Sequence, residues 1–101
     1  MSVRYLFNTS GKYVAFVTQG NHVFTKDNKW FGYINHGNQV YSPKGDFVGY
    51  LLDDDRIVSK QNDFPKLRQF PPFPPFPPLQ PLAPLPRLAK MALPFPYRDV
   101  L

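Results

Sequence analysis

The sequence predicts an all-β fold, in which four short antiparallel β-hairpins surround a pseudo-four-fold axis and a C-terminal tail adopts the polyproline II conformation. Two observations carry this prediction. A pattern recurs four times at a spacing of 17 residues over about residues 5–64, and a pattern with a period of three runs through the proline-rich region that follows. We therefore expect a four-hairpin domain at residues 1–64 and a tail at residues 65–101.

Corresponding positions of the 17-residue unit share their chemistry. One position is aliphatic, one is a Gly or Asn suited to a tight turn, and one is aromatic. A unit this short cannot bury its own apolar face and must stack on its copies. In chain order the three sets are Leu6, Val23, Val40 and Ile57; Gly11, Asn28, Gly45 and Asn62; and Tyr13, Trp30, Phe47 and Phe64.

Each unit reads as one hairpin. In the second, His22–Thr25 predicts a short strand, residues 26–28 a turn, and residues 29–35 a longer strand rich in aromatic and β-branched residues. The longer strands are apolar on both faces, which predicts that something covers the second face. A small residue at positions 15, 32 and 49 predicts close backbone approach, which we expect near a common axis.

The repeat pattern stops at Phe64, because Pro65 cannot donate a hydrogen bond within a strand. Twelve of the 13 prolines lie from Pro65 to Pro96. The fourth hairpin is therefore either truncated or completed by the tail, and the sequence leaves open how.

Every third residue of the tail is large and apolar. Polyproline II has three residues per turn and rises about 3.1 Å per residue, so these side chains would form one ridge. An exposed ridge of this size is unusual, so we expect it to dock on the hairpins of its own chain, on a neighbouring subunit or on a foreign domain. The predicted docking residues are Phe70, Phe73, Phe76, Leu79, Leu82 and Leu85, within a pattern that runs from Leu67 to Met91.

Composition disfavours several classes of function. There are no cysteines, no apolar signal segment and no run long enough to span a membrane, which predicts a cytoplasmic protein without a membrane partner. The net charge of +5 is scattered rather than gathered in a stripe, which disfavours nucleic acid as a partner.

No residue pattern indicates catalysis, and we expect no enzyme activity, cofactor or metal. His22 and His36 occupy different positions of the repeat and have no partner placed by spacing. Asp53, Asp54 and Asp55 could attract a cation but lack the spacing of a calcium loop, so a solvated turn is the favoured interpretation.

The repeat aromatic residues have two interpretations. They are either buried core positions or, arranged around an axis, faces on which a sugar, a base or a quaternary ammonium group could stack. The residues are Tyr13, Trp30, Phe47 and Phe64.

The four Gly-turn-aromatic hairpins, together with the Phe/Leu-Pro-Pro tail at residues 70–79, resemble the small bacterial four-fold beta flower proteins. The resemblance implies four short antiparallel hairpins arranged like petals, and it implies no activity. The chain departs from this pattern at Pro65.

The sequence thus favours a non-catalytic structural or protein-interaction module, whose apolar tail packs within the chain or mediates self-assembly. The alternatives are a module that binds a small ligand or glycan through the repeat aromatic residues, and a single-stranded nucleic-acid binder. The partner, the oligomeric state and the choice between docking in cis and in trans stay open.

Overall fold

The computed structural model describes residues 3–35, 37–61, 63, 66–76 and 78–101. The described residues form strands, turns and extended segments and contain no helix. None of them therefore belongs to a helix that is long and apolar enough to cross a membrane. The predicted all-β class is confirmed.

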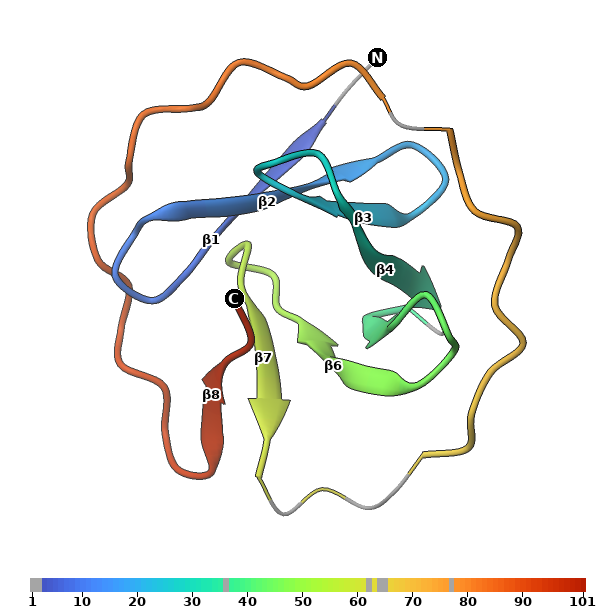
Figure 1. The fold of residues 1–101 in the computed structure, drawn as a ribbon. Coiled ribbons are helices and arrows are strands. Elements are labelled where there is room, and N and C mark those ends of the chain that lie inside the picture. The colour runs from blue at the N-terminus through green and yellow to red at the C-terminus, as the bar shows by residue number, and fades with distance from the viewer. Residues whose placement is uncertain (1–2, 36, 62, 64–65, 77) are drawn as a thin grey trace.

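Eight antiparallel strands form one sheet in the order of the chain, β1 to β8. The sheet curls, so that its two ends approach each other (Figure 1). Where they approach, the backbone N–H of Phe7 donates to the carbonyl oxygen of Asp55 at 2.8 Å. The strands are β1 Arg4–Phe7, β2 Tyr13–Thr18, β3 His22–Thr25, β4 Trp30–Asn35, β5 Gln39–Tyr41, β6 Phe47–Leu51, β7 Ile57–Lys60 and β8 Tyr97–Asp99.

Turns with positive φ join the two strands of each of the first three hairpins. Gly11, Asn28 and Gly45 have φ of 87°, 67° and 92°, and each backbone N–H bonds to the carbonyl oxygen three residues earlier. Gly and Asn tolerate this region best, which explains their choice at these positions. A register shift follows in each of the first three hairpins, between Leu6 and Phe7, Val23 and Phe24, and Val40 and Tyr41.

The fourth hairpin is completed from the far end of the chain. After β7 the chain leaves the sheet, and it returns at β8, where Val58, Ser59 and Lys60 pair with Asp99, Arg98 and Tyr97. The next residues, Val100 and Leu101, pack against the core. The completion of the fourth hairpin, which the sequence left open, is thus provided by residues that do not follow the repeat pattern. Pro65 itself lies outside the described residues.

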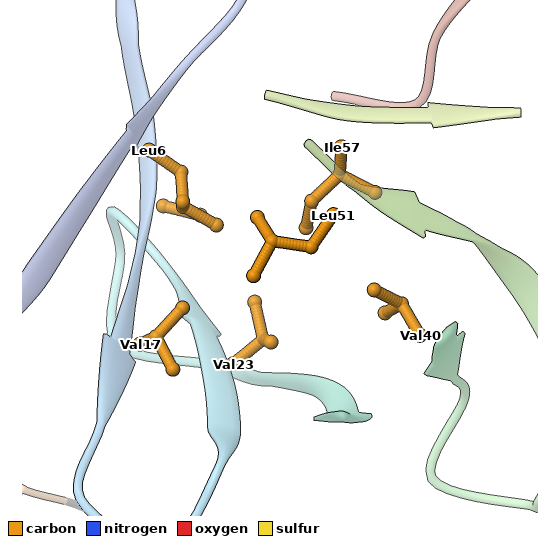
Figure 2. Packing of buried hydrophobic residues seen from close by; sticks show 7 residues of the cluster. Leu6, Val17, Val23, Val40, Leu51 and Ile57 are labelled. Carbon is orange, nitrogen blue, oxygen red and sulfur yellow. The ribbon is translucent and has the colours of Figure 1, made fainter. Parts of the chain in front are cut away.

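The core is a small aliphatic cluster at the centre of the curled sheet (Figure 2). Its side chains come from all four hairpins and point toward one another. Burying each of the larger ones stabilises the fold by about 1.5–3 kcal/mol. The members are Leu6, Ala15, Val17, Val23, Val40, Leu51 and Ile57.

The second apolar face of the long strands is covered by rings of neighbouring strands. Phe16 stacks on Phe24 and Tyr33 stacks on Tyr41, each pair with ring centroids 5.7 Å apart. The predicted close backbone approach is also present, and it brings adjacent strands together. A Cβ atom at Gly32 would overlap the carbonyl oxygen of Tyr41, which belongs to the adjacent strand β5.

Candidate interaction surface

The tail, residues 66–96, makes one circuit around the sheet. Figure 1 shows it as an extended chain that leaves the end of β7, passes outside each hairpin in turn and ends beside β7 at β8. The molecule is a disc, with principal extents of 36 × 35 × 19 Å, and the tail forms its rim. A proline-rich segment is suited to this path because each proline ring restricts its own φ and lowers the entropy cost of ordering the chain.

The tail contacts the hairpin turns through its backbone, at every ninth residue. The N–H of Gln69 donates to the oxygen of Gly45 at 2.8 Å, and the N–H of Arg87 donates to the oxygen of Gly11 at 3.0 Å. Between them, the side-chain amide of Asn28 donates to the oxygen of Pro78 at 2.8 Å. At the fourth turn the N–H of Gln61 donates to the oxygen of Pro96 at 2.9 Å. The tail therefore meets the hairpins in the order third, second, first and fourth.

Two glycines make this approach sterically feasible. A Cβ atom on Gly45 would overlap the carbonyl oxygen of Gln69, and one on Gly11 would overlap that of Arg87. Both glycines also have positive φ, so a larger residue there would be strained twice, by its own backbone and by the tail.

The apolar side chains of the tail face away from the sheet. Phe70 is 100% exposed, Phe73 is 94% and Phe76 is 95% exposed. We call the whole outward row the ridge. Its members, all at least 86% exposed, are Leu67, Phe70, Phe73, Phe76, Leu79, Leu82, Leu85, Leu88 and Met91.

The expectation that the ridge docks on the hairpins of its own chain is therefore wrong. Phe70, Phe73, Phe76, Leu79, Leu82 and Leu85 are brought onto one continuous surface, but that surface faces solvent. The tail turns a different side inward, where Gln69, Pro75, Pro78, Pro81 and Pro84 are half-buried. On this side the backbone and the proline rings of the tail face the turns. The turns present polar backbone groups, with which the backbone of the tail forms hydrogen bonds.

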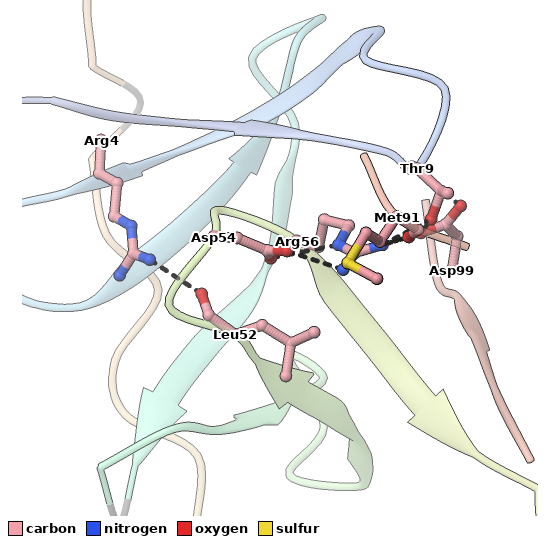
Figure 3. Close-up of polar contacts among 7 residues, drawn as sticks. All are labelled: Arg4, Thr9, Leu52, Asp54, Arg56, Met91 and Asp99. Carbon is pink, nitrogen blue, oxygen red and sulfur yellow. Dashed lines mark hydrogen bonds and ion pairs between the residues drawn. The ribbon is translucent and has the colours of Figure 1, made fainter. Parts of the chain in front are cut away.

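A buried arginine joins four distant parts of the chain (Figure 3). Arg56, only 6% exposed, forms an ion pair with Asp54 at 2.7 Å and donates to the hydroxyl of Thr9 and to the carbonyl oxygen of Met91. The same hydroxyl donates to Asp99 in β8 at 2.9 Å. The first hairpin, the fourth hairpin, the tail and β8 are thus held in one polar network.

The acidic turn is neutralised by arginines. Asp55 binds Arg4 and Arg87, each at 2.7 Å, and so ties the tail to the turn. Burial alone would raise the pKa of Asp55, but hydrogen bonds from both arginines outweigh it and hold the pKa below its ordinary value. The guanidinium of Arg87 also lies 4.2 Å from the ring centroid of Phe7, a cation–π contact. Among the described residues, no group of three His, Cys, Asp or Glu side chains is arranged to hold a metal ion.

The repeat aromatic residues are half-buried and lie in separate hairpins. Tyr13 packs on Tyr5, Trp30 on His22 and Phe47 on Tyr41, each edge to face. None of the three belongs to the central cluster. Phe64 and His36 lie outside the described residues.

Sequence reasoning missed Arg56 and Arg87. Arg56 occupies the position of Tyr5, His22 and Gln39 in the other units. A charged residue at this position, at the start of a buried strand, was the feature of the sequence that could have identified it. Arg87 breaks the run of prolines, at the point where the tail meets Gly11.

No curated protein and no solved structure matches the chain. A family model described as 4-fold beta flower protein matches residues 4–62, which include β1 to β7. Because this match covers more than half of the sequence and agrees with the curled sheet of antiparallel hairpins, the chain belongs to the 4-fold beta flower protein family.

Proposed function

We propose that this protein is a non-catalytic interaction module that self-assembles through the apolar ridge on its rim. One observation carries the proposal, the outward orientation of the ridge, whose phenylalanines are 94–100% exposed. Soluble monomers seldom expose so large a continuous apolar surface, and such surfaces mark sites of protein contact. Burying one such side chain contributes about 1.5–3 kcal/mol, so several together provide a strong drive for association.

The attachment of the tail supports this role. Because backbone groups hold the tail to the turns, the ridge side chains are not needed for the fold of one chain. The backbone is held in place before any partner arrives, so association costs less conformational entropy than it would for a free peptide.

We further infer that the tail is a polyproline II helix, matched in length to four hairpins related by a pseudo-four-fold axis. Nine residues at about 3.1 Å each advance about 28 Å, so the three steps between the four tail contacts advance about 84 Å. This is about three quarters of the circumference of a disc 36 Å across, which is the arc expected between the first and the last of four evenly spaced contacts. The 17-residue period of the hairpins and the nine-residue spacing of the tail contacts would then describe the same angle of rotation in opposite directions, one on the inside and one on the rim.

The test compares the full chain with a variant that carries Phe70→Ser, Phe73→Ser and Phe76→Ser. Sedimentation velocity over a wide concentration range should show concentration-dependent association for the natural chain and a monomer for the variant. Far-ultraviolet circular dichroism should be the same for both, because the replaced side chains contact solvent.

A matched control replaces two exposed hairpin lysines, Lys29→Ser and Lys60→Ser, and should associate like the natural chain. The proposal fails if the natural chain is monomeric at every concentration, or if the ridge variant is folded and associates undiminished.

A further inference from the structure

The junction between the third and fourth hairpins lacks an aromatic residue that is present at the two preceding junctions between hairpins. Phe16 in β2 pairs with Phe24 in β3, and Tyr33 in β4 pairs with Tyr41 in β5; both pairs stack. At the third junction Tyr50 in β6 pairs with Val58 in β7. A valine thus stands where the equivalent residues are Phe24 and Tyr41, and half of the stack is missing.

A cleft of about 340 Å³ lies at this third junction. For comparison, a cavity of ~150 Å³ holds a benzene molecule. Most of the lining is apolar or aromatic, and the one charged lining group, Arg56, is already paired with Asp54. The cleft therefore suits an uncharged ring. Its walls include Tyr50, Leu52, Val58, Leu93, Pro94 and Tyr97.

We propose that a phenylalanine from the ridge of a second copy of this chain fills the cleft and completes the stack on Tyr50. The proposal rests on the proposed function and names the contact by which copies associate. Phe70, Phe73 and Phe76 offer the missing ring, because they are the most exposed rings in the described chain. Each would bury an exposed apolar side chain in a site that lacks one.

The charges beside the two surfaces do not oppose this pairing. Asp54 and Asp55, next to the cleft wall, are already paired with arginines of the same chain, and Arg68, two residues before Phe70, is paired with Asp46. Asp53 is exposed beside Leu52 of the cleft wall, so a basic group that enters with the ring would meet it at the edge of the cleft.

The two surfaces lie on different parts of the rim. In Figure 1 the amber segment that carries the three phenylalanines runs along the right side of the disc, whereas β8 and the preceding residues lie at the lower left. The contact joins two different surfaces, so repeating it in one direction gives a closed ring or an extended filament.

The experiment supplies the missing ring within the chain. Val58→Phe restores the residue type found at positions 24 and 41 and should occupy the cleft, whereas Val58→Ile keeps an aliphatic side chain and leaves room for a ring. We expect Val58→Phe to weaken self-association at least tenfold by sedimentation equilibrium, and Val58→Ile to change it less than twofold.

A second measurement uses a labelled synthetic peptide of residues 66–80 and the full-length protein. Fluorescence anisotropy should show binding to the natural chain, at least tenfold weaker binding to Val58→Phe, and loss of binding when the peptide carries serine at 70, 73 and 76. If Val58→Phe does not fold, Tyr97→Ala at the cleft wall takes its place and should weaken peptide binding as well.

The outcomes separate the two proposals. If the triple ridge variant is monomeric while folded Val58→Phe associates and binds the peptide normally, the cleft is not the receptor and the self-assembly function stands. If the natural chain does not associate at all and does not bind the peptide, both proposals fail. Peptide binding that survives the serine replacements would overturn the insertion of a phenylalanine.

Discussion

The backbone N–H of Gln69 donates a hydrogen bond of 2.8 Å to the carbonyl oxygen of Gly45, and the carbonyl of Gln69 lies where a side chain at position 45 would be. This contact between tail and hairpin depends on the absence of a Cβ atom. It is one of the four contacts, nine residues apart along the tail, that join the tail to the hairpin turns, and together they place the ridge on the outside.

Gly45→Ala should detach the tail from the third hairpin. A non-glycine residue at positive φ costs about 1–3 kcal/mol, and overlap with Gln69 should add roughly 1–3 kcal/mol more. The matched control is Gly37→Ala, because Gly37 has φ of 84° and nothing within 4 Å of the added Cβ. Urea unfolding of both variants should show the larger loss for Gly45→Ala, together with faster proteolysis in the tail near residue 69. Equal losses would show that the tail does not rest on Gly45.

Arg56→Ala should lower the free energy of unfolding by about 2–3 kcal/mol, because hydrogen bonds of a charged group to Thr9 and Met91 are lost inside the protein. Arg4 provides the comparison, since its side chain is 41% exposed and its ion pair with Asp55 is at the surface. Arg4→Ala should cost about 1 kcal/mol or less. Chemical denaturation measures both, and a ranking opposite to this one would contradict the structural role of Arg56.

Ending the chain after Pro96 should unfold the sheet or leave it prone to aggregation. The truncation removes β8, exposes the edge of β7 and deletes Val100 and Leu101 from the core contacts. We expect a loss of at least about 3 kcal/mol, seen as a lower urea midpoint and weaker near-ultraviolet circular dichroism. Arg98→Ser, which replaces an exposed side chain and keeps the strand, should change stability by about 0.5 kcal/mol or less. A truncated chain as stable as the natural one would remove β8 from the fold.

Acid should loosen the tail through Asp55. Its pKa in the folded protein lies below the ordinary value of 3.8, so its contribution to stability is fully present above that pH and is lost as the pH falls through the lower folded-state pKa. Measured against Asp55→Asn, the natural chain should be more stable at neutral pH, and the difference should shrink only below about pH 3.8. A difference that does not change between neutral and acidic pH would mean that the two arginines do not act through the charge of Asp55.

The strands and turns follow from the sequence because each hairpin is specified locally. The turn residues Gly11, Asn28 and Gly45 require positive φ, and the alternation of Leu6, Val23, Val40 and Ile57 with turn signals places four aliphatic side chains at one centre. Local chemistry of this kind needs no information from distant residues, so the all-β class could be predicted. The aliphatic positions, rather than the repeat aromatic residues, form the central cluster.

The orientation of the tail could not be predicted by the same reasoning. A period of three residues defines three sides of the tail, and hydrophobicity alone selects the side with Phe70 and Phe73 for burial. The turns instead offer backbone oxygens and N–H groups, which are satisfied by the backbone at Gln69 and Arg87. The sequence of the tail does not show that the turns it binds offer backbone groups for hydrogen bonds.

The fourth hairpin escaped prediction for a different reason. Tyr97–Asp99 is three residues long and has a charged centre, so neither length nor alternation marks it as a strand. It becomes one because β7 has an unpaired edge and because Val100 and Leu101 have a place in the core.

The return of the chain at β8 also has a consequence for the order of folding. The first three hairpins close short turns, whereas β7 and β8 can pair only after residues 61–96 have been brought round the whole sheet. Closing a long loop carries a larger entropic cost, and contacts between residues distant in sequence slow folding. We expect the first three hairpins to form early and the β7–β8 pairing to limit the rate, so substitutions in β8 should slow the rate-limiting step of folding while leaving the early steps unchanged.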